Sequence, residues 1–173
     1  MAISLYDVSV VSFLQVVGSV EQILARGLAH AQDSAIDPES LVSARLTHDM
    51  LPLAFQVLSV AHHSIDAIEG CKAGVFGVPG AIGQPTYADL QKIVANAKAG
   101  LEALTPDEVN GLQGRKVVFR MPNFEIPFTA EGFLMSFSLP NLHFHATTAY
   151  DILRANGAPL GKRDYLGAMR IAA

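Results

Sequence analysis

Residues 139–157 read LPNLHFHATTAYDILRANG, which has the pattern of one helix with a marked beginning and end. Pro140 suits the first turn of a helix, where the missing N–H of proline costs nothing. Arg154 falls in the last turn, where a cation interacts favourably with the helix dipole. Asn156-Gly157 is typical of a left-handed C-terminal stop, and Pro159 prevents the helix from continuing. The stretch therefore predicts the last long helix of a helical protein.

One stripe of this predicted helix carries the clearest chemical feature of the chain. Four residues follow one another at spacings of four, three and four, so they lie on one face. These residues are Asn141, His145, Thr148 and Ile152. An imidazole on such a stripe is either a metal or ligand contact in a central cavity, or a buried neutral histidine with a hydrogen bond. The sequence leaves both interpretations open.

Hydrophobic periodicity predicts three further long helices upstream. They span residues 4–31, 49–70 and 86–104. Asp37-Pro38-Glu39 has the pattern of a helix start, which predicts a short helical turn over residues 38–45. Thr86 followed by Asp89 resembles a capping box at the start of the third long helix. Thr105-Pro106-Asp107 marks the end of that helix.

Two segments between the long helices lack a helical pattern. Residues 73–85 hold four glycines and two prolines, which predicts an irregular loop. Residues 116–121 and 124–128 flank the turn signal Pro122-Asn123, which predicts a short hairpin. Thr129 then begins the last helical region, and Pro140 either kinks that region or starts a new helix.

Together these elements predict an all-α protein with a single domain over residues 1–173, a length that suits one core. Four long amphipathic helices, with a short hairpin or irregular insertion before the last, suggest a four-helix bundle. The tail is expected to dock on this bundle through Leu160, Tyr165 and Leu166. Lys162 and Asp164 are interpreted as salt-bridging residues that lock the tail, rather than as functional groups.

The composition excludes several classes of function. Half of the residues are hydrophobic and only 16% are charged, as in a globular rather than a disordered protein. The net charge is −4 and no basic run is present, so neither nucleic acid nor a membrane is an expected partner. The one cysteine, Cys71, permits no internal disulfide and suits a reducing, cytoplasmic location. Neither a secretory signal nor a transmembrane helix is expected.

The last helix and the tail resemble a known family. The pattern is Pro140-Asn141-x-x-Phe144-His145, then Ala149-Tyr150-x-Ile152-Leu153-Arg154-x-Asn156-Gly157, then Leu160-Gly161-Lys162-x-Asp164-Tyr165-Leu166-Gly167. Asp49-Met50-x-Pro52-Leu53, at the start of the second helix, fits the same family. These are short bacterial proteins of unknown function in the DinB/YfiT-like superfamily, and the resemblance covers nearly the whole chain.

This resemblance implies a DinB-like bundle of the up-down-down-up type with one divalent metal ion, Zn²⁺ or Ni²⁺, between the helices. The superfamily usually supplies three histidines, one from the second helix and two that lie four residues apart on the last helix. His145 matches the second histidine of that pair, whereas Asn141 stands in place of the first. The chain therefore departs from the family pattern at one ligand.

The second helix is expected to supply the remaining ligand. His48, Phe55 and His62 are spaced by seven residues and lie on the side expected to face the bundle. His63 lies on a different stripe, which is interpreted as solvated. The other residues of this stripe are polar: Gln56, Ser59 and Asp66. The predicted metal ligands are thus His145, His62, His48 and Asn141.

Two functional hypotheses follow. The first is a divalent-metal-dependent enzyme with a degraded metal site, of the thiol transferase or hydrolase type, in which the metal activates water or a thiol. The second is a non-catalytic dimeric protein that binds a small molecule or a partner and has a metal-free polar cavity. A homodimer is expected by analogy and from the apolar composition. The geometry of the histidines distinguishes the two hypotheses.

Overall fold

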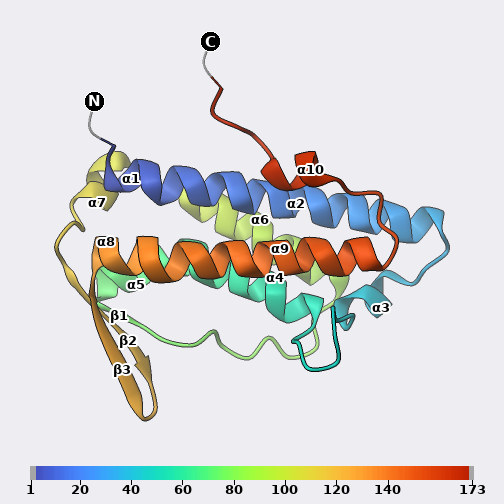
Figure 1. The fold of residues 1–173 in the computed structure, drawn as a ribbon, viewed down its shortest axis with the longest axis horizontal. Helices are drawn as coiled ribbons and strands as arrows, with labels where there is room; N and C mark the ends of the chain where they lie inside the picture. The colour runs from blue at the N-terminus through green and yellow to red at the C-terminus, as the bar shows by residue number, and fades with distance from the viewer. Residues whose placement is uncertain (1–2, 172–173) are drawn as a thin grey trace.

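Four long helical segments run side by side (Figure 1). The computed structural model describes residues 3–171. The segments are α1–α2 (Leu5–Val8 and Val10–Asp33), α4–η1–α5 (Leu53–Ala61, His62–Asp66 and Ala67–Ala73), α6 (Tyr87–Glu102) and α8–η2–α9 (Ala130–Phe133, Leu134–Ser138 and Leu139–Ala155). The shorter helices are α3 (Pro38–Val42), α7 (Pro106–Asn110) and α10 (Lys162–Leu166). The prediction of an all-α protein is confirmed in part, because most of the chain is helical.

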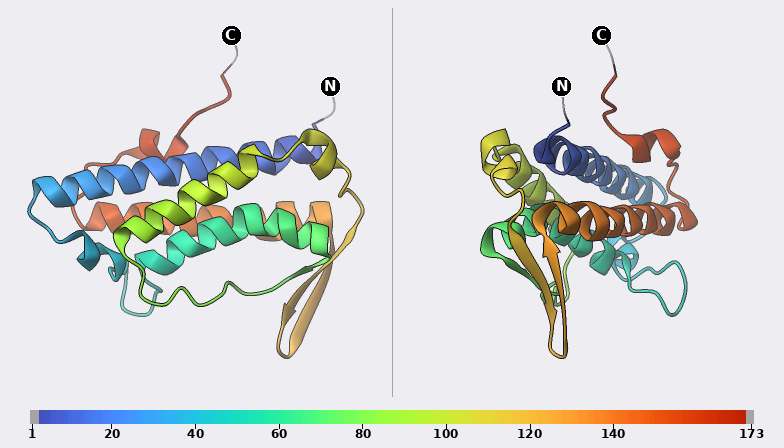
Figure 2. Two further views of the ribbon diagram at one scale, coloured as in Figure 1. Left: turned by 180° about the vertical axis from the view of Figure 1, so that it is seen from behind. Right: turned by 60° about the vertical axis from the view of Figure 1, so that its left-hand side comes forward.

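The four segments enclose one hydrophobic core. Helices α2 and α4 each pack against both α6 and α9, so the segments form a ring around shared apolar side chains. Helices α2 and α9 run in one direction, whereas α4–α5 and α6 run in the other (Figures 1 and 2). The connection over residues 74–86 allows this order, because it returns the chain along the length of the bundle before α6 begins.

Capping residues fix where several helices begin. The Thr86 hydroxyl accepts a hydrogen bond from the Asp89 N–H at 3.2 Å, and the Asp89 carboxylate accepts one from the Thr86 N–H at 2.9 Å. The predicted capping box of α6 is therefore confirmed. Thr105 makes the same arrangement with Glu108 and begins α7, where the sequence predicts only the end of the preceding helix.

A three-stranded sheet packs at one end of the bundle. Strands β2 (Lys116–Met121) and β3 (Phe124–Thr129) form the predicted antiparallel hairpin. Strand β1 (Val75–Phe76) pairs in parallel with β2, inside the segment that the sequence predicts to be an irregular loop. A strand of two residues is too short to show alternation, so periodicity cannot reveal it. The all-α prediction is thus corrected to a mostly helical protein with a small sheet.

The second long helix differs from its predicted range at both ends. The sequence predicts residues 49–70, but the helix begins at Leu53, because Pro52 is its extended N-cap residue. It ends at Ala73, where Gly74 adopts the left-handed conformation with a φ of +76°. In its middle, the turn η1 is π-helical. The helix is therefore displaced toward the C-terminus and is not a regular α-helix throughout.

The last helical segment continues through Pro140. A second π-helical turn, η2, ends at Ser138, two residues before Pro140. In a regular α-helix the ring of proline clashes with the carbonyl of the preceding turn. A π turn is wider than an α turn, so it accommodates the ring without ending the helix. Pro140 therefore neither terminates the helical segment nor starts a separate one.

The tail docks on α2, as the sequence predicts. Asp164 is ion-paired with Arg26 of α2. The Gln15 side chain donates a hydrogen bond to the Leu166 carbonyl at 2.8 Å. Lys162 is exposed and makes no ion pair with any residue in the range 3–171. Asp164 therefore has the predicted locking role, whereas Lys162 does not.

The helical segment Leu5–Asp33 is long and apolar enough to cross a membrane by length and composition, whereas no such helix is expected from the sequence. Half of its most apolar 18-residue window is buried inside the protein. Its fully buried residues, among them Phe13, Val17 and Leu24, belong to the shared core. A buried core helix has the same length and composition, so this finding alone does not assign the helix to a membrane.

Candidate functional site

Three imidazole rings meet between the second and the last long helical segments. The ring centroid of His63 lies 5.2 Å from that of His62 and 5.7 Å from that of His145. Gln56, which is buried in α4, reaches the ring of His145. We call His62, His63, His145 and Gln56 the imidazole cluster. The phenylalanine rings that contact it are Phe55, Phe76, Phe137 and Phe144.

The two π turns meet at this cluster. His62 and His63 belong to η1, and both are buried, because a π turn contains an extra residue and shifts the direction of successive side chains. Phe137 belongs to η2, and its ring centroid lies 5.7 Å from that of His63. Single π turns inside α-helices occur frequently at functional sites. The two π turns and the three histidines therefore indicate the same candidate site.

His63 corrects a prediction made from the sequence. The stripe that it shares with Gln56 and Ser59 is interpreted there as solvated, but His63 is only 7% exposed and the other two residues are buried as well. Asp66 is the member of this stripe that is exposed. The sequence contains a signal for this burial, because the other sides of the helix are hydrophobic and such a helix is buried all round. Its polar stripe then points into the protein.

Hydrogen bonds fix the tautomer of His145. The Gln56 Nε2 donates to the Leu51 carbonyl at 2.8 Å, so the Gln56 Oε1 faces the imidazole. His145 therefore donates from Nδ1 to this oxygen, also at 2.8 Å. In the neutral ring, Nε2 is then an acceptor, and no described residue donates a hydrogen bond to it.

Burial keeps two of the imidazoles neutral. Burial lowers the pKa of His63 to about 3, and the neighbouring His62 and His145 add to this effect. Burial also lowers the pKa of His145 to about 4, again with a contribution from His62. The Nδ1 atom of His63 is buried without a hydrogen-bond partner among the described residues. At pH 7 His63 and His145 are therefore uncharged rings, and the Nδ1 of His63 and the Nε2 of His145 keep free bonding capacity.

The structure brings two of the four predicted metal ligands into the cluster. His145 and His62 both belong to it, but His62 donates from Nε2 to a backbone carbonyl of the 74–86 connection at 2.9 Å. Asn141 donates from Nδ2 to a backbone carbonyl of its own helix at 2.8 Å. His48 is exposed in the connection before α4. The Asn141 amide is therefore bonded to its own helical segment, and His48 does not belong to the imidazole cluster.

A three-histidine metal site does not fit this arrangement. Imidazole lone pairs lie in the plane of the ring, so the stacked rings of His63 and His145, 9° from parallel, do not direct them to one point. Among residues 3–171, no group of three or more His, Cys, Asp or Glu side chains is placed to hold a metal ion. Burial raises the pKa of the Cys71 thiol to about 12, so no thiolate is available there either.

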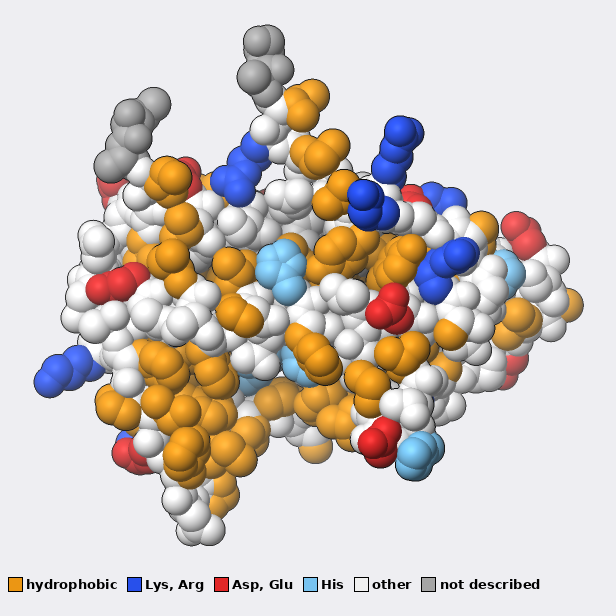
Figure 3. Space-filling model, in the orientation of Figure 1, with side chains coloured by type: hydrophobic (Ala, Val, Ile, Leu, Met, Phe, Trp, Pro, Cys, Tyr) orange, Lys and Arg blue, Asp and Glu red, His pale blue; other side chains and the backbone are white. Residues whose placement is uncertain are grey.

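A groove runs over α9 beside the cluster. It has a volume of about 580 Å³ and lies between α9 and the connection that precedes α4. Leu46, Met50 and Phe144 supply apolar walls, while Thr148 and Asp151 add polar groups. The ring of Phe144 is 56% exposed, and its centroid lies 5.3 Å from that of His145. Figure 3 shows this face of the molecule, on which histidine side chains lie among apolar ones.

Comparison with solved structures defines the class of protein. A crystal structure of a DinB family member protein from Shewanella denitrificans, at 1.83 Å resolution, matches with a TM-score of 0.80 and 28% sequence identity. The match covers 98% of this chain and 95% of that chain, so the fold is DinB-like over almost its full length. Residues 5–166 match the family described as Domain of unknown function (DUF1993), and the chain belongs to this family. No curated protein matches the chain.

Proposed function

We propose that this DinB-like protein is a non-catalytic binding protein that holds a small molecule in the groove on α9 without a three-histidine metal centre. The observation that carries the proposal is the open groove on α9 beside a cluster in which Gln56, His62 and the Nδ1 of His145 already have hydrogen-bond partners. Ligand sites in proteins typically have volumes of a few hundred to about 1,000 Å³ and mostly apolar walls. The groove has a volume in this range and apolar residues in its wall, and it is shallow and open to solvent.

The lining of the groove indicates the general shape of the ligand. Leu46, Met50 and Phe144 lie on its apolar side, so an apolar or aromatic body fits there. Thr148 and Asp151 lie on its polar side, and a carboxylate accepts hydrogen bonds from a donor group. The imidazole cluster supports this wall from within, because the ring of His145 packs edge-on against that of Phe144.

A metal-dependent or acid–base enzyme is less well supported. A general base works best with a pKa near the operating pH, whereas the pKa of His145 is lowered to about 4. The observation that favours metal binding is the unpartnered Nδ1 of His63, because a neutral imidazole is a good ligand for Zn²⁺ or Ni²⁺. His63 and His145 together would supply two ligands at most, so a four-coordinate ion would need its other ligands from other groups.

The fluorescent probe 1-anilinonaphthalene-8-sulfonate tests the groove, because it binds apolar surface in solution. We expect saturable binding by the wild-type protein and a loss of about tenfold in affinity for Phe144→Ser, which removes the largest apolar wall. Phe124→Ser is the matched control, since Phe124 is 54% exposed on the hairpin, away from the groove residues. Equal affinities for the wild type and Phe144→Ser would contradict the proposal.

A further inference from the structure

A small pocket lies where the tail that follows α9 crosses α2. Its volume is about 220 Å³. Its polar wall comes from three segments that are far apart in sequence: Ser12 and Gln15 of α2, His143 of α9, and Tyr165 and Arg170 of the tail. Figure 1 shows α10, the helical part of the tail, lying against α2. We call this cavity the tail pocket. It is separate from the groove on α9, with which it shares only His143.

The tail rests directly on α2 at Gly167. This glycine has a φ of +58°, and a Cβ atom there would lie 3.2 Å from the Gln15 carbonyl oxygen and 3.3 Å from the Ser19 Cβ. The Ser19 hydroxyl donates a hydrogen bond to the Asp164 carbonyl at 2.9 Å. Any other residue at position 167 is strained at this φ and crowded by α2. Close backbone contact therefore fixes the outer wall of the tail pocket.

Arg170 gives the tail pocket a positive charge, and no described residue of its lining is acidic. Its Nη1 lies 3.4 Å from the Asp7 carbonyl oxygen and its Nη2 lies 3.5 Å from the Ser12 Oγ, which are long distances for hydrogen bonds. It makes no ion pair with any residue between positions 3 and 171. The Asp7 carboxylate instead accepts hydrogen bonds from the Ser4 N–H at 3.0 Å and the Ser4 hydroxyl at 2.7 Å. The guanidinium group is therefore left without a carboxylate partner.

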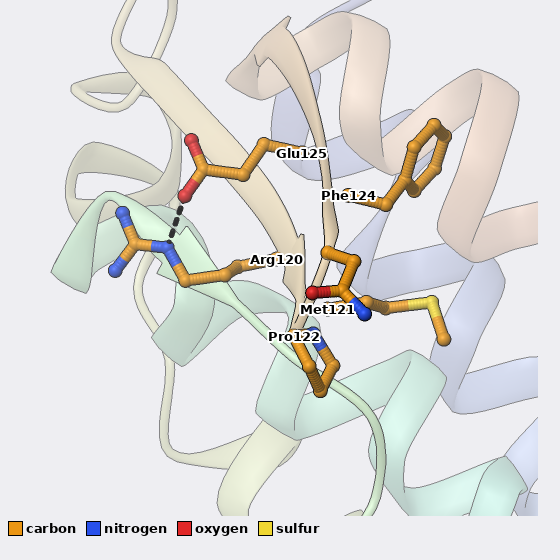
Figure 4. A pocket seen from close by; sticks show the side chains of 6 residues that line it. Arg120, Met121, Pro122, Phe124 and Glu125 are labelled. Carbon is orange, nitrogen blue, oxygen red and sulfur yellow. Dashed lines mark hydrogen bonds and ion pairs between the residues drawn. The ribbon is translucent and has the colours of Figure 1, made fainter.

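The cavity at the tip of the hairpin differs from the tail pocket in this respect. It has a volume of about 470 Å³ and is lined by residues 120–125 alone. Figure 4 shows that its arginine, Arg120, is paired with Glu125, with 2.6 Å between Nε and Oε1. An anion would have to displace Glu125 from Arg120, and it would meet the wall of a single turn. The tail pocket offers an unpaired arginine between three segments.

A second hydrogen-bond donor lies beside Arg170. Thr147 donates from its hydroxyl to the Tyr165 hydroxyl at 3.0 Å. The Tyr165 hydroxyl in turn lies 3.1 Å from the Nδ1 of His143, to which it donates. Burial lowers the pKa of His143, so its ring is neutral at pH 7 and carries its hydrogen on Nε2. This N–H has no acceptor among the described residues, so it is available to a ligand.

We propose that the tail pocket binds a small carboxylate that carries an apolar body. The Arg170 guanidinium donates two parallel N–H bonds to the carboxylate, a geometry that arginine favours, and the His143 Nε2–H is a further donor. Val16, Leu139 and Leu166 form the apolar part of the wall and contact the body of the ligand. The volume lies below that of sites for drug-sized ligands, which suits an acid with one ring or a short chain.

Isothermal titration calorimetry of the full chain with benzoate tests this proposal. We expect saturable binding with a dissociation constant on the order of 0.1–1 mM. Arg170→Gln should weaken the binding about tenfold or more, because it removes the bidentate charge contact. Benzamide has the same ring without the charge, and inorganic phosphate has charge without an apolar body. Both should bind more weakly than benzoate.

Three further variants separate the tail pocket from other sites. Arg163→Gln removes the same charge from the same tail, but Arg163 is exposed and does not line the pocket. Phe144→Ser changes the groove on α9. Both should bind benzoate like the wild type. Gly167→Ala should weaken benzoate binding without a loss of helix content by circular dichroism, because it displaces the tail from α2.

Several results would overturn the proposal. One is the absence of saturable benzoate binding to the wild type, and another is equal affinity of the wild type and Arg170→Gln. An equal loss in Arg163→Gln would show that the net charge of the tail, rather than a contact of Arg170, attracts the anion. Loss of benzoate binding in Phe144→Ser would place the ligand in the groove on α9. Phosphate that binds as tightly as benzoate would exclude a role for the apolar wall.

Discussion

Lowering the pH from 7 to 4 is expected to reduce the free energy of unfolding by about 3–6 kcal/mol. The cause is the buried imidazoles, because burial lowers the pKa of His63 to about 3 and that of His145 to about 4. In the unfolded chain both titrate near 6.5. The unfolded state therefore binds protons first as the pH falls, and stability is lost progressively below about pH 6.5. Above that pH the contribution is fully present.

Urea unfolding at a series of pH values measures this effect. His63→Leu removes one of the two groups, so the loss of stability between pH 6.5 and pH 4.5 should be clearly smaller than in the wild type. His48→Gln is the matched control, because His48 is exposed. Capped carboxylates such as Asp89 and Glu108 have a pKa below the ordinary value, so their protonation affects the free energy of unfolding mainly at lower pH. An identical pH dependence for the wild type and His63→Leu would show that His63 is not buried as an uncharged ring.

Replacing Phe133 by alanine is expected to reduce the free energy of unfolding by about 3–5 kcal/mol. Phe133 is fully buried where the sheet meets the last helical segment. Its ring centroid lies 4.9 Å from that of Phe76, 5.8 Å from that of Phe128 and 5.5 Å from that of Phe137. Alanine leaves a cavity between three elements that cannot all close around it, so both transfer free energy and packing are lost.

Chemical denaturation at pH 7 provides the measurement. Phe144→Ala is the matched control on the same helical segment. Because the Phe144 ring is exposed, this variant should reduce the free energy of unfolding by less than about 1–2 kcal/mol. Phe133→Leu should fall between the two, because it retains most of the apolar volume. A loss of stability for Phe133→Ala that is no larger than for Phe144→Ala would contradict the described aromatic packing at the base of the sheet.

Sequence signals that act locally predict much of this fold. The capping box at Thr86, the cap at Thr129 and the stop at Gly157 depend on a few adjacent residues, and the structure places helix ends at each of them. The hairpin follows from alternation around Pro122-Asn123 in the same way. Strand β1 could not be predicted, because its two residues become a strand only through pairing with β2, about forty residues away in sequence.

The candidate site is less predictable, because it depends on helix geometry that periodicity does not encode. A regular α-helix over residues 49–70 places His62 and His63 on different faces, whereas the π turn η1 buries both. The stripe on the last helix indicates His145, but no sequence signal indicates its partner Gln56, since a polar residue in a helix is usually exposed. The groove depends on the path of the connection before α4, which no short motif determines.

The most direct test of the proposed function is a Zn²⁺ and Ni²⁺ titration of untagged protein, combined with elemental analysis of the protein as purified. We expect less than stoichiometric metal after purification, and weak binding that is the same for the wild type and His145→Ala, because the cluster does not direct three ligands to one point. About one tightly bound ion per chain, lost in His145→Ala, would contradict this account and would establish the imidazole cluster as a metal site.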